Sequence, residues 1–345
     1  MNNNKKEKIM NKITKIGASA LCGSLAAISA ANAGDLSVTG GVDMSWTSLP
    51  KANSGNPIGI GSNLTFSGSG ELDNGWSVAL TVAHTNANAY SNTNVVIGIP
   101  GLGDIRVDEG TTGTGIDRMD DNTPNVWEEA YGTGLGTGID TVSGVSGGTN
   151  IEWTPNTPDG TTVRVAWSPD VGGKNGNDKG TGASNSVKGA GFDITVEASG
   201  DAMGLEGLTL YGGVSQIENY QNSTAINGDN QEMTVGAKFA VGRFTLGYQW
   251  SEEETGRATT NIKYQNDGYG VTFSVSDDLS IGYNLYKSHK DSTTDVEVEA
   301  RSIQVAYSVG GLSVRLADAT VDNALYATAG TNQRDATTLS VALAF

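Results

Sequence analysis

The last eleven residues, 335–345, alternate between larger and smaller side chains with the period of a β-strand. One parity carries Thr337, Leu339, Val341, Leu343 and Phe345. The other parity carries only alanine, serine and threonine after Asp335. Because successive side chains of a strand point to opposite faces, this strand has one apolar face that must be covered by a protein core or by lipid.

The same alternation recurs in fifteen earlier segments, beginning with 34–47. Tight turns such as Asp73–Gly75 alternate with long polar connections such as 48–60 and 109–148. Short turns at one end and long loops at the other are typical of barrels that span an outer membrane. The pattern therefore predicts an all-β fold: a transmembrane antiparallel β-barrel with short periplasmic turns and long external loops. Sixteen strands are expected, with fourteen to eighteen compatible with the pattern, and the last strand should pair with 34–47.

A secreted or surface-attached all-β binding protein, such as an adhesin, is the alternative to a membrane barrel. It would also have period-2 strands and loops rich in glycine and asparagine. It would bury one face against a second sheet, so it would not need large apolar side chains on the same parity of sixteen successive segments. The alternation of loop lengths therefore favours the membrane barrel.

Residues 1–33 have the pattern of a signal peptide. Five lysines precede an uncharged run that starts at Ile16, and Ala31-Asn32-Ala33 provides the small residues that a signal peptidase recognises. We expect export through the Sec pathway and cleavage before Gly34, which leaves 34–345 as the mature chain. A membrane anchor is disfavoured because glycine and serine make the run weakly apolar. Cys22 is the only cysteine, so the exported chain has no disulfide.

The charge of the chain limits its partners. The net charge is −17, and removal of the lysine-rich residues 1–33 makes the mature chain more acidic still. Such a surface is unfavourable for nucleic acid, and we expect no nucleic-acid partner. The low average hydrophobicity does not argue against a barrel, because apolar and polar residues alternate in every strand.

Two hairpins resemble those of Gram-negative general diffusion porins. Residues 95–110 contain an apolar-Gly-apolar strand, a turn through Pro-Gly-Leu-Gly and a return strand before the longest loop. Residues 150–169 resemble the next porin hairpin, with Trp-Thr-Pro before the turn and Trp-Ser-Pro after it. The terminal strand ending at Phe345 looks like the assembly signal of the family. The chain resembles the alphaproteobacterial, Rhodobacter-like porins in particular.

The resemblance implies a function, a location and partners. It implies a passive diffusion pore for small hydrophilic solutes in the outer membrane, assembled as a homotrimer. The barrel would contact outer-membrane lipid and lipopolysaccharide, and Phe345 would be read by the barrel-assembly machinery. The long loop, residues 109–148, would fold into the lumen and form the constriction.

The charges of the long loop predict a preference for cations. The predicted constriction residues are Asp117, Asp120, Asp121, Glu128 and Glu129, and Arg118 is the only cation of the loop. The predicted pore-lining wall residues are Asp104, Arg106, Asp108, Arg164 and Arg315. The first four predicted strands contain no lysine or arginine, so no arc of cations opposes the loop. Acidic rings favour cations in wide pores.

Other chemistry has weaker support in the sequence. Oxygen ligands from Asp117, Asp120 and Asp121 would suit Ca²⁺, although the spacing is not that of an EF-hand; otherwise no cofactor is expected. His84 and His289 are the only histidines, and no nucleophile elbow, phosphate loop or paired-histidine motif occurs. We therefore predict that the chain is not an enzyme. A sugar-selective porin is a further alternative, because a track of aromatic side chains built by folding is invisible in sequence.

Overall fold

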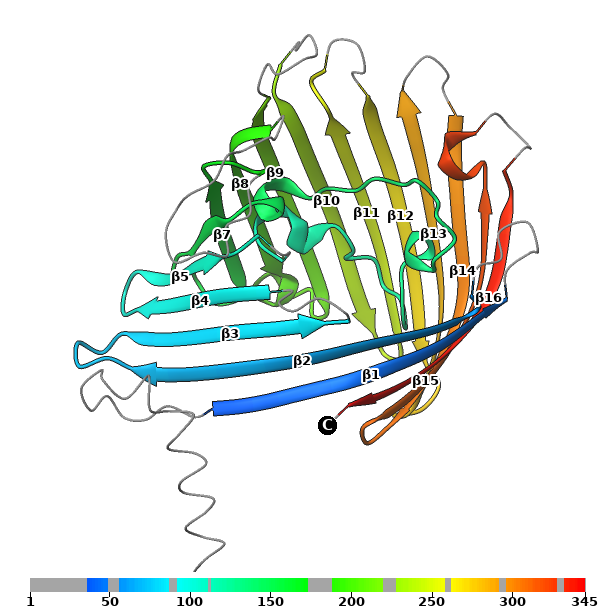
Figure 1. Ribbon diagram of the computed structural model, residues 1–345, viewed down its shortest axis with the longest axis horizontal. Helices are drawn as coiled ribbons and strands as arrows, with labels where there is room; N and C mark the ends of the chain where they lie inside the picture. The colour runs from blue at the N-terminus through cyan, green and yellow to red at the C-terminus, as the bar shows by residue number, and fades with distance from the viewer. Residues whose placement is uncertain are drawn as a thin grey trace, which may run out of the picture.

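In the part of the chain that the structure describes, sixteen β-strands close into one antiparallel barrel (Figure 1). This computed structural model describes residues 36–48, 56–86, 92–110, 113–172, 188–219, 228–257, 262–291, 296–327 and 332–344. The predicted signal peptide and Phe345 lie outside these residues. Within them, no helix is both long enough and apolar enough to cross a membrane.

The strands follow one another around the barrel in chain order. They are β1 Leu36–Ser48, β2 Ile58–Glu71, β3 Ser77–Thr85, β4 Asn92–Ile99, β5 Gly103–Asp108, β6 Asn150–Thr154, β7 Thr161–Ser168, β8 Lys188–Ser199, β9 Leu208–Asn219, β10 Asn230–Val241, β11 Phe244–Glu254, β12 Lys263–Ser274, β13 Leu279–Asp291, β14 Val296–Val309, β15 Leu312–Asp322 and β16 Arg334–Ala344. Short 3-10 helices lie between strands: η2 Gly115–Met119, η3 Ala130–Gly132, η4 Gly144–Gly147, η5 Gly200–Met203 and η6 Ala324–Tyr326.

The first and last strands close the barrel. β1 pairs antiparallel with β16, so that Trp46 lies opposite Leu339 and Gly41 lies opposite Ala344. Every other strand pairs with its two neighbours in sequence. The predicted sixteen-strand antiparallel barrel is confirmed, and so is the predicted pairing of its first and last strands.

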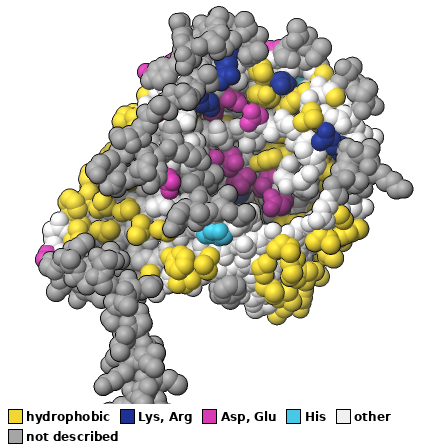
Figure 2. Space-filling model, in the orientation of Figure 1, with side chains coloured by type: hydrophobic (Ala, Val, Ile, Leu, Met, Phe, Trp, Pro, Cys, Tyr) yellow, Lys and Arg dark blue, Asp and Glu magenta, His cyan; other side chains and the backbone are white. Residues whose placement is uncertain are grey.

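The two faces of the wall differ in polarity as the alternation predicts. Large apolar side chains point outward and are solvent-exposed in the isolated chain, from 37% for Trp76 to 72% for Ile60. Figure 2 shows hydrophobic side chains on the outer surface and acidic side chains gathered in the central hollow. A continuous apolar exterior of this kind has to be covered by lipid or by another chain.

The wall is not equally high all around the barrel. β14 has 14 residues, whereas β5 has six and β6 has five. A barrel strand needs about 9–11 residues to cross the hydrocarbon core of a bilayer. The wall at β5 and β6 is therefore too low to face lipid over the full thickness of that core.

Part of the long loop packs inside the barrel against β13–β16 and η6. The buried apolar cluster there consists of Ala130, Leu135, Tyr286, Val298, Ala300, Ala319, Val321, Ala324 and Ala336. Small residues dominate the strand positions of this cluster, which lets the loop backbone approach the wall closely. The loop thus has its own hydrophobic contact with the interior of the barrel.

Candidate functional site

The long loop connects β5 to β6 and carries η2, η3 and η4. In Figure 1 it lies within the ring of strands rather than above it. Apart from residues 111 and 112, the whole loop is described. Inward-facing side chains of β6 to β16 hold it in place through hydrogen bonds.

Two buried carboxylates of the wall bind the first part of the loop. Asp193 of β8 accepts hydrogen bonds through Oδ2 from the backbone N–H groups of Ile116, at 3.0 Å, and Val145, at 3.1 Å. Glu152 of β6 accepts the N–H of Gly115 at 2.7 Å. Hydrogen bonds to charged acceptors are about twice as strong as neutral ones. These donors lie in the first turns of η2 and η4, where backbone N–H groups have no partner within the helix.

A third carboxylate binds the end of the loop. Glu232 of β10 accepts the backbone N–H groups of Ser143 and Gly144 through Oε2, each at 2.7 Å. Asp193 contacts both the beginning and the end of the loop, so it links the two halves to one point of the wall. Glu152, Asp193 and Glu232 therefore anchor the long loop to the wall.

Amide side chains bind the middle of the loop. Gln249 of β11 accepts the N–H of Asn122 at 3.1 Å and donates to the carbonyl oxygen of Met119 at 2.5 Å. Gln304 of β14 accepts the N–H of Trp127 at 3.1 Å. An amide satisfies both kinds of backbone group and adds no charge. The loop is therefore held by carboxylates near its ends, and by these amides together with Arg334 of β16, which donates to the carbonyl oxygens of Leu135 and Gly136, nearer its middle.

The loop tip, residues 122–127, and the residues just after it also contact side chains of β13. The hydroxyl groups of Thr123 and Tyr286 lie 2.6 Å apart. Asn284 of β13 accepts the N–H of Ala130 at 2.9 Å and donates to the Thr123 hydroxyl at 3.2 Å. Together with Gln249 and Gln304, these contacts fix the tip along the wall.

The predicted constriction acids do lie on one stretch of the loop, but their charges are not equal. The pKa of Asp120 is raised to about 9, mainly by burial and, to a smaller extent, by repulsion from Asp121 and Asp117. Burial raises the pKa of Glu129 to about 7, and its carboxylate accepts a hydrogen bond from Asn125. At neutral pH Asp120 is therefore protonated, and the field of the loop is weaker than its formal charge suggests.

The other loop acids are also influenced by burial. It raises the pKa of Asp117, whose Oδ2 accepts the N–H of Gly113 at 2.5 Å. Burial raises the pKa of Glu128 as well, while the positive charge of Arg315 opposes that shift. Asp121 is exposed. Among the described residues, no lysine, arginine or histidine forms an ion pair with any of the five predicted constriction acids.

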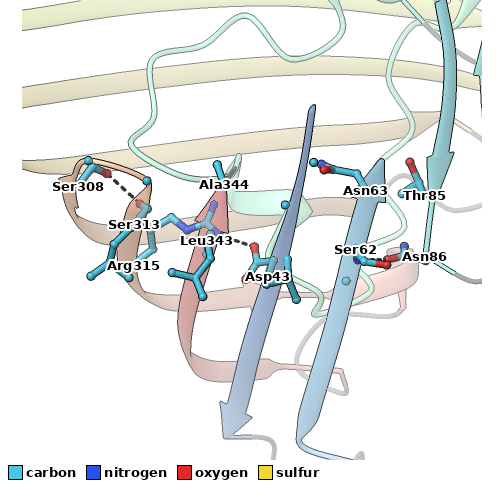
Figure 3. Close-up of a pocket in the computed structure, with 18 residues that line it drawn as sticks. Asp43, Ser62, Asn63, Thr85, Asn86, Ser308, Ser313, Arg315, Leu343 and Ala344 are labelled. Carbon is cyan, nitrogen blue, oxygen red and sulfur yellow. Dashed lines mark hydrogen bonds and ion pairs between the residues drawn. The ribbon is translucent and has the colours of Figure 1, made fainter. Parts of the chain in front are cut away.

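The predicted wall arginines are engaged in local contacts. Arg106 forms an ion pair with Asp108 at 2.6 Å and donates to the carbonyl oxygen of Gly113, so both residues hold the start of the loop. Arg315 forms an ion pair with Asp43, as Figure 3 shows, and its guanidinium lies 5.1 Å from the centre of the Trp127 ring. These cations are neutralised by neighbours instead of facing the lumen unpaired.

Two predicted wall residues lie away from the others. Asp104 of β5 is exposed beside a hollow near the short turns, which Glu71 and Ser77 also line. Arg164 of β7 is electrostatically coupled to Arg118 and Glu152. The five predicted wall residues therefore form no single cluster, but occupy separate positions at the start of the loop, the seam of the barrel, the short-turn end and the β7 wall.

The described residues give the calcium hypothesis no geometric support. Among them, no group of three or more His, Cys, Asp or Glu side chains is arranged to hold a metal ion. Asp117, Asp120 and Asp121 lie near one another, but Asp117 uses one carboxylate oxygen on the loop backbone. Calcium binding at these residues stays a prediction.

The anchoring residues were not singled out from the sequence. Glu152, Asp193 and Glu232 stand on the inward parity of their predicted strands, and so do Gln249 and Gln304. Parity places a polar residue in the lumen but does not indicate whether water or a loop covers it. These five side chains differ from other lumen residues in being buried, with at most 3% of each exposed. Their burial follows from the position of the loop, which the sequence does not show.

Comparison with known proteins agrees with this fold. The chain is similar to OmpF of Salmonella typhi in complex with daunomycin, with 13% identity, 91% of this chain and 98% of the other covered, and a TM-score of 0.67. It is similar to the trimer form of OmpT of Vibrio cholerae, with 12% identity, coverage of 91% and 100%, and a TM-score of 0.65. The anion-selective porin of Comamonas acidovorans has 14% identity, coverage of 90% and 100%, and a TM-score of 0.61. At these identities the likeness concerns the fold alone.

Sequence comparison assigns the family. No curated protein sequence matches the chain. A family model described as Gram-negative porin matches residues 17–344, which is nearly the whole chain. Such porins are non-enzymatic channels of the outer membrane, in agreement with the prediction that the chain is not an enzyme. The chain belongs to the Gram-negative porin family.

Proposed function

We propose that this porin is a passive diffusion pore for small hydrophilic solutes and that it prefers cations. The cation preference rests on one observation: arginines around the loop form ion pairs with carboxylates, whereas the acids of the loop do not. Arg106, Arg118 and Arg315 each form an ion pair with a carboxylate. The acids at positions 117, 121, 128 and 129 have no such partner among the described residues, and neither does Asp120, which is protonated at neutral pH and adds charge only at higher pH. The surplus charge of the loop is therefore negative.

The long loop is the proposed constriction of this pore. A sixteen-strand barrel encloses a channel that is wide unless a segment narrows it. The loop occupies the side of the lumen along β6 to β16, where its hydrogen bonds to the wall lie. Solutes would pass between the acidic loop and the inner face of β1–β4. That inner face contains no lysine or arginine, so a solute meets carboxylates on one side and mostly hydroxyl, amide and small groups on the other.

We infer that the chain forms a homotrimer through the outer face of β1–β5. The outward side chains of these strands include no Asp, Glu, Lys or Arg in the described residues. On β11–β14, by contrast, outward ion pairs such as Glu252 with Lys263 and Lys287 with Glu299 mark the loop ends of the strands. The low wall at β5 needs a protein cover, which a second copy supplies. The related OmpT structure is a trimer form.

Other partners follow from the proposed location. The apolar exterior of the remaining strands would contact lipid, and the charged loop ends would lie level with lipopolysaccharide headgroups. Recognition by the barrel-assembly machinery through Phe345, export through Sec and the Rhodobacter-like subtype rest on the sequence motifs and stay predictions. No specific observation favours a sugar-selective pore.

Conductance measurements test this function. The purified protein should produce discrete single-channel steps in a planar bilayer and should migrate differently on detergent gels before and after heating. Under a salt gradient the reversal potential should have the sign of a cation-preferring channel. A stable, folded protein without conductance would contradict the pore, whereas an anion-preferring channel would contradict only the charge preference.

A further inference from the structure

Two inward-facing glycines lie directly opposite each other under the loop tip. Gly247 of β11 pairs with Gly270 of β12, and Pro124 of the tip lies against both. A Cβ atom at Gly270 would lie 2.2 Å from the carbonyl oxygen of Pro124. A Cβ atom at Gly247 would lie 2.3 Å from the Pro124 Cδ atom. The wall has no room for any side chain at these two positions while the tip stays where it is.

The tip cannot avoid such a side chain by sliding along the wall. Gln249 holds the backbone of Asn122 on one side of Pro124, and Gln304 holds that of Trp127 on the other. The Thr123 hydroxyl is also tied to Tyr286. Carbon atoms pack about 3.5–4 Å apart, so an added methyl group would displace the tip by about 1 Å or more. The direction left open to it is away from the wall.

We propose that Gly247 and Gly270 are specificity-determining residues that set the bore of the pore. By carrying no side chain they let the tip lie flat against β11 and β12, which leaves the rest of the lumen open to solutes. This inference rests on the proposed role of the long loop as the constriction. It assigns the size limit of the pore to the wall behind the loop as well as to the acidic residues on its surface.

Alanine substitutions test the proposal. Gly247→Ala and Gly270→Ala should each lower the single-channel conductance and exclude neutral polymers of a size that the unmodified pore admits. Gly228→Ala is the control for a glycine-to-alanine change, because Gly228 is exposed in the connection between β9 and β10 and a Cβ atom there has no neighbour within 4 Å. It should leave both quantities unchanged. Heat-dependent migration on detergent gels reports whether each variant forms a folded barrel.

A second substitution distinguishes the proposed contact from general damage. Pro124→Ala removes Cγ and Cδ, which are the atoms nearest to a Cβ atom at position 247, but leaves the backbone atoms that are nearest at position 270. Pro124→Ala should therefore restore conductance to Gly247→Ala and not to Gly270→Ala. If Gly270→Ala does not fold, the comparison of Gly247→Ala with and without Pro124→Ala still tests the proposed contact.

The outcomes distinguish failure of this inference from failure of the proposed function. Normal conductance and an unchanged polymer cut-off in folded Gly247→Ala would overturn the role of the glycines, and so would equal rescue of both variants by Pro124→Ala. An unmodified protein that never conducts would instead overturn the pore itself.

Discussion

Arg118 of the long loop forms an ion pair with Glu152 of β6, in which Nη2 lies 2.6 Å from Oε1. The only cation of the loop is thereby neutralised by the wall. Glu152 also accepts the N–H of Gly115, so one side chain anchors the loop and cancels its positive charge. The Glu152 side chain is 2% exposed, whereas that of Arg118 is 28% exposed and reaches water.

Replacing Glu152 should therefore change both stability and selectivity. In Glu152→Ala the Gly115 N–H loses its acceptor and Arg118 becomes an unpaired cation beside the acids of the loop. We expect the free energy of unfolding in detergent to fall by about 1–3 kcal/mol and the cation preference to decrease. Glu71→Ala, at the short-turn end of β2, removes the same charge and should affect stability less. Equal losses for the two variants would contradict the anchoring role.

Neutralising the loop acids should lower the cation preference without closing the pore. Neither Asp120 nor Asp121 has a cationic partner among the described residues, and Asp120 is protonated at neutral pH. At that pH the double substitution Asp120→Asn and Asp121→Asn therefore removes one negative charge, at position 121. We expect the reversal potential under a salt gradient to move toward zero, with conductance retained. Asp159→Asn, in the exposed turn between β6 and β7, is the control for net charge and should leave the reversal potential unchanged. A similar shift in both proteins would assign the selectivity to the overall charge of the molecule.

The cation preference should increase with pH through the neutral and mildly alkaline range. The pKa of Glu129 is about 7 and that of Asp120 about 9, so both carboxyl groups lose protons and gain negative charge as the pH rises. Reversal potentials measured from about pH 6 to about pH 10 should move toward stronger cation preference. Asp120→Asn should remove the alkaline part of this change. A preference independent of pH in the unmodified protein would contradict these raised pKa values.

The same raised pKa values determine how the free energy of unfolding changes with pH. Ordinary carboxyl groups ionise near 3.8 for Asp and 4.5 for Glu, so the unfolded chain releases protons that folded Asp120 and Glu129 retain. The native state therefore binds more protons between these values and the raised ones. The contribution of both groups to the free energy of unfolding is full below the ordinary pKa and declines as the pH rises through about 7 and then about 9. Unfolding in detergent at several pH values measures it, and Asp120→Asn should reduce the slope.

The fold was predictable because the pattern of a barrel strand is local. Alternation in 335–344 and in 36–48 fixes which face of each strand is apolar, and a barrel leaves no edge strand in the membrane. The pairing of β1 with β16 then follows from closure. Strand lengths were only partly accessible: the loop expected from residue 109 agrees with the end of β5 at Asp108, but the sequence does not show that β14 continues for 14 residues.

The candidate site was predictable only in part, because its energetics depend on contacts across the lumen. Counting acids in the loop identified Asp120 and Glu129 but not the burial that keeps Asp120 protonated at neutral pH. Parity placed Arg315 on the inner wall, yet its pairing with Asp43 joins residues 272 positions apart in the chain. The roles of Gly247 and similar positions are invisible in sequence, since a glycine that admits a loop looks like any other strand glycine.

The outer face of β1–β5 should mediate trimer formation, which single substitutions can test. Leu80 of β3 and Val235 of β10 both point outward and are 40% and 53% exposed in the isolated chain. A polar side chain at a protein interface disrupts packing between copies, whereas at a lipid-facing position it affects only the single barrel. Leu80→Asn should lower the temperature at which trimers dissociate on semi-native gels, and Val235→Asn should leave that temperature nearly unchanged. The reverse result would place the contact between copies on the β10 side and leave the low wall at β5 and β6 to be covered by something other than a second copy.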